Sequence, residues 1–193
     1  RDIGVTGVQT CALPISGKRV LVHGASGGVG SFAVQLAKAL GAHVTATTSP
    51  GGVAVVERCG ADVVLDRTQV DFAASGERWD AIVAAGGDLK LDRYAAALTS
   101  TGRYAMIGGT NAQLLDGTLH AWSRSRRNGQ QFKVVAARSN RADLEQIARW
   151  VVDGRVAPIV DSTFPLDEAP AAIARVEAGR ARGKVVVHVT PPS

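Results

Sequence analysis

The sequence lacks the residues that cross-link or anchor a protein. Its 193 residues include only two cysteines, Cys11 and Cys59. Without paired spacing, two cysteines exclude a disulfide scaffold and a cysteine-based zinc site within this chain. No apolar run approaches the roughly 20 residues that a membrane-spanning helix needs, and no signal peptide is visible. We therefore expect a cytoplasmic protein without a membrane partner.

Aromatic residues are also scarce, at 5% of the chain, although 46% of its residues are hydrophobic. That hydrophobic content is enough for one sizeable core, or for one domain and part of another. The formal net charge is +5, and the densest basic cluster consists of Arg124, Arg126, Arg127, Lys133, Arg138 and Arg141. Because no aromatic ladder is interleaved with this cluster, we interpret it as solvated surface and not as a nucleic-acid-binding site.

Residues 5–15 have neither a helical nor a strand period. Their string, Val-Thr-Gly-Val-Gln-Thr-Cys-Ala-Leu-Pro-Ile, resembles one reading frame of a common sequencing adapter translated as protein. Our hypothesis is that residues 1–15 are a non-native leader, that Cys11 carries no meaning, and that an upstream portion of the protein is missing. An ordinary irregular lead-in is the alternative, and resequencing the source gene distinguishes the two.

Strand and helix patterns alternate from residue 18 onward. The patterns predict strands at residues 18–23, 43–48, 61–65, 80–84, 103–107 and 132–136, and helices at 29–40, 53–58 and 89–98. Such alternation indicates an α/β fold, a doubly wound parallel sheet of the Rossmann type with strand order 3-2-1-4-5-6. After residue 140 we expect a helix ended by Gly154, a second helix capped by Asp167, and a strand at 184–189.

The glycine-rich turn at residues 24–30 follows a β-branched strand and opens an amphipathic helix. This context is typical of a dinucleotide-binding turn. Gly27 and Gly28 let the backbone approach a diphosphate, and Gly30 lets the helix pack close to the strand. The helix N-terminus then faces the phosphates. A turn that only packs strand against helix, with no ligand, is the alternative.

The end of the second strand bears on the choice of cofactor. NAD-binding proteins usually place an acidic residue there to bond the ribose 2′-hydroxyl, but this chain has Thr47, Thr48 and Ser49. Without a carboxylate a 2′-phosphate is not repelled, Ser49 can donate to it, and Arg58 or Arg67 can supply positive charge. Each arginine taken alone is more simply interpreted as solvated. We predict NADPH, with NADH as the alternative.

Several segments, in order, resemble the medium-chain dehydrogenases/reductases, specifically their zinc-independent quinone oxidoreductase branch. They are residues 18–49 with Ala-Ser-Gly-Gly-Val-Gly at 25–30, and residues 60–64, 101–109 and 178–187. The resemblance implies an NADPH-dependent reductase that transfers hydride to a quinone or an α,β-unsaturated carbonyl. It implies a Rossmann domain at 16–139, a segment at 140–193 belonging to an otherwise missing barrel-like catalytic domain, and a homodimer formed through the edge strand at 132–136.

The resemblance also assigns cofactor-binding residues. The diphosphate would lie against Ser26, Gly27, Gly28 and Val29, and the adenosine 2′ position would lie near Thr48 and Ser49. The nicotinamide side would be lined by Ala84, Ala85, Gly86, Ile107, Gly108 and Gly109. The sequence departs from the family where many NADPH-binding members have a lysine after the second strand, because Gly51, Gly52 and Val53 stand there. It also has Ala84 and Ala85 where an Asp-containing turn is common.

No catalytic residue and no metal ligand can be assigned. His23 at a strand end is more simply a packed neutral histidine, and His120, Tyr94 and Tyr104 are equally unsupported. The zinc-bearing relatives would keep their ligands largely in the absent domain. A non-catalytic nucleotide-binding module, or a relative of the NAD(H)- or zinc-dependent alcohol dehydrogenases, remains as an alternative. We expect this chain on its own to be inactive.

Overall fold

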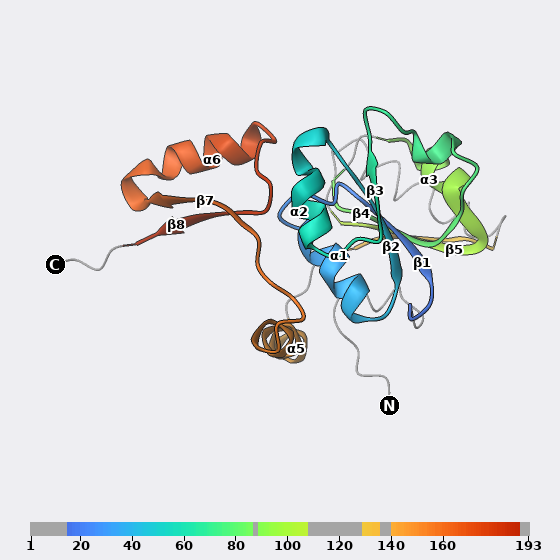
Figure 1. The fold of residues 1–193 in the computed structure, drawn as a ribbon, viewed down its shortest axis with the longest axis horizontal. Coiled ribbons are helices and arrows are strands. Elements are labelled where there is room, and N and C mark those ends of the chain that lie inside the picture. Colours follow the sequence, from blue (N-terminus) through green and yellow to red (C-terminus); the bar gives the residue numbers. More distant parts are fainter. Residues whose placement is uncertain (1–14, 87–88, 108–128, 136–139, 190–193) are drawn as a thin grey trace.

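The computed structural model describes residues 15–86, 89–107, 129–135 and 140–189 (Figure 1). Within these ranges every helix is too short or too polar to cross a lipid bilayer. The elements of the first part are β1 (Arg19–His23), α1 (Gly30–Ala39), β2 (His43–Thr48), η1 (Pro50–Gly52), α2 (Val53–Arg58), β3 (Val63–Asp66), η2 (Phe72–Ala74), β4 (Trp79–Ala84), α3 (Leu91–Ala97), β5 (Leu98–Met106) and β6 (Gln131–Val134). The elements of the second part are α5 (Arg141–Val152), β7 (Val160–Pro165), η3 (Leu166–Glu168), α6 (Ala169–Glu177) and β8 (Lys184–His188).

The first part is a six-stranded sheet in which every pair of neighbouring strands is parallel. Its strand order is β3-β2-β1-β4-β5-β6, which confirms the predicted doubly wound sheet. Side chains alternate between two cores, because successive residues of a strand point to opposite faces. Val20 and Val22 of β1 pack under α1 and α2, whereas Leu21 packs on the α3 side. The sheet is therefore covered on both faces, as parallel sheets require.

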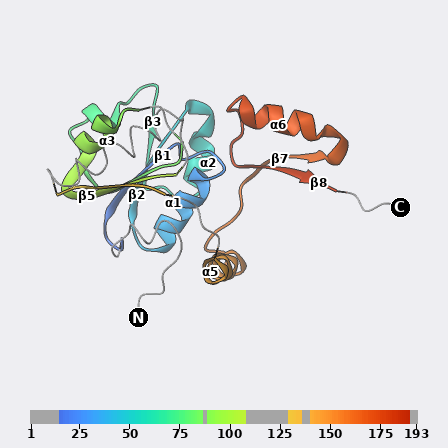
Figure 2. The ribbon, with the colours of Figure 1, turned by 180° about the vertical axis from the view of Figure 1, so that it is seen from behind.

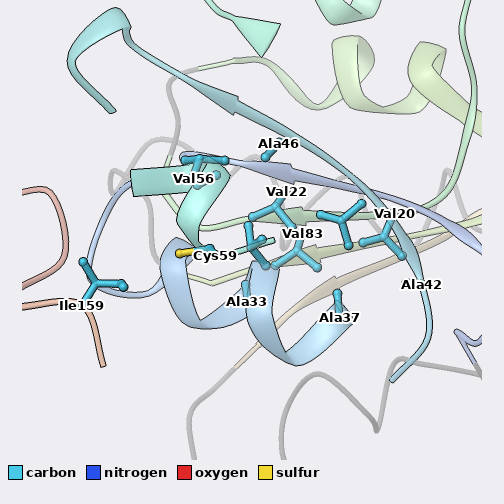
Figure 3. Packing of buried hydrophobic residues seen from close by; sticks show 13 residues of the cluster. Val20, Val22, Ala33, Ala37, Ala42, Ala46, Val56, Cys59, Val83 and Ile159 are labelled. Atoms are coloured by element: carbon cyan, nitrogen blue, oxygen red, sulfur yellow. The ribbon is translucent and has the colours of Figure 1, made fainter. Parts of the chain in front are cut away.

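The core under α1 is built from small and β-branched side chains. Figure 3 shows Val20, Val22 and Val83 of the sheet facing Ala33 and Ala37 of the helix. Alanine on the helix lets its axis lie close to the sheet, and this close packing fixes where the first turn of α1 lies. The N-terminus of α1 is thereby held at the carboxyl end of β1, where the glycine-rich turn was predicted to hold a diphosphate.

Several predicted boundaries were wrong. β5 begins at Leu98, inside the predicted helix, and its pairing with β4 shifts register between Trp79 and Ala81. Asp167 does not cap the second C-terminal helix, because residues 166–168 form a 3₁₀ turn and Glu168 stands at the cap position without a side-chain hydrogen bond. β7 was not predicted, since its sequence lacks an apolar run.

The second part contacts the first through α5 and the segment that follows it. Trp150 and Val156 are buried against the outer face of α1, where Leu36 belongs to the same cluster. The Gln35 side chain bonds the backbone of Ala157 in both directions: its Nε2 donates to the carbonyl at 2.9 Å, and its Oε1 accepts from the amide at 2.7 Å. α6, β7 and β8 form a separate group beside the sheet (Figures 1 and 2).

The dimer prediction falls on β6, which is the edge strand of the described sheet. Phe132 is buried there, with its ring centroid 5.8 Å from that of Tyr104. Ala136, the predicted end of this strand, lies outside the described residues. Pairing between two copies through this edge stays a prediction.

Candidate cofactor-binding site

The carboxyl ends of the parallel strands bring most of the predicted site residues to one edge of the sheet. Backbone hydrogen bonds continue the ladder past the strand ends: the Ala25 amide donates to Thr47 at 3.0 Å, and the Ala85 amide donates to His23 at 2.9 Å. The Ile107 amide donates to Ala84 at 2.8 Å. The turns after β1, β2, β4 and β5 therefore meet at this edge, the position at which open α/β sheets bind ligands. Gly108 and Gly109 lie outside the described residues.

Two glycines of the turn are required by the protein itself. Gly24 has a φ of +76°, and an added Cβ would lie 2.7 Å from the Gly86 carbonyl oxygen. An added Cβ on Gly30 would lie 2.1 Å from the Gly24 carbonyl oxygen and 2.7 Å from the Cα of Ala25. Side chains at these positions would push α1 away from the strand. This geometry agrees with the role predicted for Gly30.

Gly27 and Gly28 are different, because an added Cβ at either position would meet neighbouring atoms at longer distances than at Gly24 or Gly30. An added Cβ on Gly27 would meet only the Gly24 carbonyl oxygen at 3.7 Å, an ordinary contact, and its φ is not positive. An added Cβ on Gly28 would meet the Gly183 carbonyl oxygen at 3.1 Å. Glycine at 27 is thus explained by neither backbone strain nor packing. A ligand that approaches the backbone would explain it.

The N-terminus of α1 is free of the groups that usually neutralise it. Val29, at the cap position, provides no side-chain hydrogen bond, and the first turn contains no acidic residue. Val29 is also 44% exposed, so its side chain does not belong to the buried apolar face of α1. The partial positive charge of the helix end is therefore directed at the turn, which suits a phosphate.

A buried hydrogen bond between Ser26 and Thr48 connects the turn to β2. The Thr48 hydroxyl donates to the Ser26 hydroxyl oxygen at 2.8 Å, and Thr48 is only 2% exposed. Gly52 closes over this pair, since an added Cβ would lie 2.1 Å from the Thr48 Oγ1. Thr48 therefore holds the shape of the site from beneath, whereas Ser49, half-buried, is the side chain at the surface of this strand end.

Sequence reasoning missed two cations that the second part brings to the site. The Lys184 side chain lies against the turn, within 3.4 Å of where a Cβ on Gly28 would stand, and its Nζ is 5.6 Å from the Phe32 ring centroid. Arg182 donates from Nη2 to the Ser49 Oγ at 3.3 Å. Both are more than 130 residues from their neighbours in the chain, so only tertiary structure reveals them.

Asp161 holds the segment that carries these cations. Its carboxylate accepts from the Arg175 Nε at 2.5 Å, from the Ser162 hydroxyl at 2.9 Å and from the backbone amide of Arg182 at 3.0 Å. The hydrogen bond from Arg175, together with those from Arg182 and Ser162, outweighs the effect of burial and lowers the pKa of Asp161 from 3.8 to about 2.

Acid is expected to loosen this segment. Because the pKa of Asp161 is lower in the folded state, its contribution is fully present above the unfolded value of 3.8 and is lost as the pH falls through about 2. The shift corresponds to about 1–2 kcal/mol after allowance for the solvent exposure of Arg175. Hydrogen exchange of the β7–β8 amides in wild type and Asp161→Asn measures it, with the exposed Asp167→Asn as control. If the wild type keeps the same extra protection of these amides over Asp161→Asn at pH 2 as at neutral pH, the ionised Asp161 carboxylate is not what stabilises the segment.

The side chains considered for acid–base roles that the structure describes are buried within the protein. His23 is 4% exposed, its Nδ1 is 2.8 Å from the Thr47 Oγ1, and its ring lies beside those of Phe72 and Tyr94. Tyr94 and Tyr104 are buried in the same cluster on the α3 side. His120 lies outside the described residues.

A metal site does not emerge from the described part of the chain, where no three His, Cys, Asp or Glu side chains are grouped to hold an ion. The single cysteine described, Cys59, is buried, and burial raises the pKa of its thiol. The residues described here therefore do not fit a zinc ion.

A doubly wound parallel sheet with a glycine-rich turn at its carboxyl edge is the architecture of the Rossmann-type dinucleotide-binding fold. Residues 59–187 match the family model described as zinc-binding dehydrogenase. The chain belongs to this zinc-binding dehydrogenase family, within the medium-chain dehydrogenase/reductase superfamily, as a quinone oxidoreductase-like member.

Similar proteins support the same placement. The chain is 32% identical over 204 residues to the trans-enoyl reductase pgmF of Aspergillus terreus, covering 97% of this chain and 57% of the relative. It is 34% identical over 201 residues to the mitochondrial NAD(P)H oxidoreductase RTN4IP1 of Mus musculus, covering 90% and 48%. The solved quinone oxidoreductase from Coxiella burnetii superposes with a TM-score of 0.80 at 27% identity, covering 97% and 58%. The chain thus spans about half the length of the curated relatives it matches.

Proposed function

We propose that this chain is the cofactor-binding portion of an NADPH-dependent oxidoreductase that reduces a quinone or an α,β-unsaturated carbonyl. The observation that carries the proposal is the glycine turn, in which Gly24 and Gly30 are required by packing whereas Gly27 is not. Ordinary folding accounts for the first two, and a bound diphosphate accounts for the third. The names of the relatives, a reductase and an NAD(P)H oxidoreductase, support the reaction class.

The residues of this chain would bind and orient the cofactor. The backbone of Gly27 and Gly28 and the N-terminus of α1 would hold the diphosphate, with Lys184 adding positive charge beside it. Ala85, Gly86 and Ile107 would line the nicotinamide side with small or apolar groups that exclude water. When bound, the reduced nicotinamide would supply a hydride from C4 to the electrophilic carbon of the substrate.

The 193-residue chain is expected to bind NADPH weakly, with a Kd on the order of 10–100 µM, because it builds only one wall of a cofactor cleft. Turnover with a quinone or an enone is expected to be absent. Fluorescence titration measures the binding, and loss of NADPH absorbance with a quinone present measures the turnover. Catalysis by this chain alone would contradict the expectation of inactivity, and no binding of either NADPH or NADH would overturn the proposed function.

A second domain in the complete protein is part of this proposal. The second part of the chain exposes many large apolar side chains, namely Leu144, Val151, Val152, Val160, Leu166, Ile173, Val176, Val186 and Val189. Apolar surface gathered on one part of a protein is typical of a face that packs against something else. We propose that residues 140–193 complete a catalytic domain whose remainder is not in this chain.

The second candidate is a nucleotide-binding module without catalysis. It is favoured by the burial of His23, Tyr94 and Tyr104, the described side chains that were considered for acid–base roles. The whole gene product discriminates the two. NADPH oxidation coupled to reduction of a quinone or enone supports the oxidoreductase, whereas binding without turnover in that protein supports the module.

A further inference from the structure

An arginine from the far end of the chain reaches the position where the two nicotinamide cofactors differ. Arg182 stands just before β8, yet its Nη2 donates to the Oγ of Ser49 at 3.3 Å, at the end of β2. Its Nε and Nη2 are 3.8 and 3.9 Å from where a Cβ on Gly51 would stand. The edge of the guanidinium that bears Nε and Nη2 therefore faces the loop after β2.

The guanidinium is held in place before any ligand arrives. Its Nη1 donates to the carbonyl oxygens of Gly179 at 3.1 Å and Ala181 at 3.3 Å. The Arg182 backbone amide is bonded to Asp161, as described above. A planar group fixed through one nitrogen loses little further conformational entropy when the rest of it binds.

Gly183, the residue after Arg182, connects the Arg182 backbone to the hydrophobic core. Gly183 has a φ of +121°, and an added Cβ would lie 2.4 Å from the Ile159 carbonyl oxygen. The Lys184 amide donates to that same oxygen at 2.7 Å, and Ile159 is buried in the core cluster under α1. The position of Arg182 therefore depends on packing that is shared with the sheet.

The remaining donors of Arg182 are available to an anion. Nε–H and one of the two Nη2–H groups have no acceptor among the described residues, and Nε with Nη2 forms the edge of the guanidinium through which arginine can bind a carboxylate or a phosphate in a bidentate manner. No acidic side chain stands at the end of β2, where Thr47, Thr48 and Ser49 are found. Of Arg58, Arg67 and Arg182, only Arg182 is bonded to Ser49 in the described structure.

We propose that Arg182 selects NADPH over NADH by binding the adenosine 2′-phosphate through its Nε and Nη2, beside Ser49 and the loop after β2. This inference rests on the proposed function, because it assigns the selectivity of the same cofactor site. It replaces Arg58 and Arg67 as the source of positive charge. The cation comes from the C-terminal part of the chain, and it stands in for a lysine that the loop after β2 does not contain.

The test compares dissociation constants for NADPH and NADH in the 193-residue chain and its variants. Arg182→Ala should weaken NADPH binding about 10- to 100-fold, the range expected for a hydrogen-bonded charge pair, and should change NADH binding less than about 3-fold. Arg182→Lys should retain part of the NADPH affinity, because lysine keeps the charge but loses the fork. Arg180→Ala, an exposed arginine two residues away, is the matched control and should leave both constants unchanged.

A second probe isolates the phosphate. Adenosine 2′,5′-bisphosphate should compete with NADPH for the wild type and should lose affinity in Arg182→Ala, whereas adenosine 5′-monophosphate should not distinguish the two proteins. Thermal unfolding of each variant establishes that it is folded, and Arg182→Lys supplies the same comparison should Arg182→Ala fail to fold.

The outcomes separate the two proposals. Equal losses for NADPH and NADH in Arg182→Ala, or a loss for NADPH confined to Arg58→Ala or Arg67→Ala, overturns the role of Arg182 and leaves the proposed function standing. A wild-type chain that binds NADH as well as NADPH also overturns the role of Arg182. A wild-type chain that binds neither cofactor overturns the proposed function, and the inference fails with it.

Discussion

Gly30→Ala is expected to destabilise the protein by about 3 kcal/mol or more, a value at the upper end for a single added methyl group. The new Cβ would lie 2.1 Å from the Gly24 carbonyl oxygen and within 3 Å of the Ala25 backbone. Neither neighbour is a flexible side chain, so relief requires α1 to move away from the sheet. That movement would open the core formed by Ala33 and Ala37. Guanidinium unfolding, compared with wild type, measures the loss.

The control for this substitution is in the same turn. Gly27→Ala adds the same methyl group where the nearest atom is 3.7 Å away, and it should leave stability unchanged or raise it by up to about 1 kcal/mol. If Gly30→Ala and Gly27→Ala unfold at the same denaturant concentration, then the close packing of the helix against the turn does not govern stability.

Gly27→Asp is expected to reduce NADPH affinity at least about 100-fold while the protein stays folded. The turn has room for the side chain, but the carboxylate would occupy the approach to the N-terminus of α1 and repel the diphosphate. Juxtaposed like charges in a binding site cost several kcal/mol, more than the ~2.7 kcal/mol that a 100-fold loss represents. Titration of NADPH fluorescence gives the affinity, and the denaturant midpoint reports on the fold.

Two further variants separate charge from size and position. Gly27→Ala, which adds bulk without charge, should weaken binding less than Gly27→Asp does. Ala74→Asp adds the same charge in η2, which lies against the opposite face of the sheet, and should not affect binding. NADPH affinity of Gly27→Asp within 3-fold of wild type would mean that the diphosphate does not lie at this turn.

The order of the six strands was predictable from sequence because each piece of evidence is local. Residues 20–22 of β1 and 44–48 of β2 are all apolar or β-branched, and glycines follow both α1 and α2, at Gly41 and Gly60. Buried parallel strands and the helices between them produce these sequence patterns locally, independently of contacts with distant parts of the chain. The glycine turn was predictable for the same reason, since its strand, turn and helix are contiguous.

Other features depend on contacts that no local pattern records. β7 pairs with β8 across the whole of α6, and its sequence, Val-Asp-Ser-Thr-Phe-Pro, has no apolar run to indicate a strand. The contact between Arg182 and Ser49 spans 133 residues of sequence, and arginines are common enough on surfaces that one more attracted no attention. Asp167 was a reasonable cap by residue type, but the 3₁₀ turn at residues 166–168 moved the helix start beyond it.

The paired hydrogen bonds between Gln35 and Ala157 bear on how this fold can be recombined. A change of sequence texture near residue 140 suggests a place to exchange the C-terminal segment with that of a relative. However, the donor and acceptor that secure that segment belong to α1, more than a hundred residues earlier. A chimaera joined at residue 140 would combine α1 from one protein with the segment around residue 157 from another, and these two surfaces would not have evolved together. The unit that can be inherited or transplanted intact therefore comprises α1 with residues 141–159, although these two stretches are not contiguous in the gene.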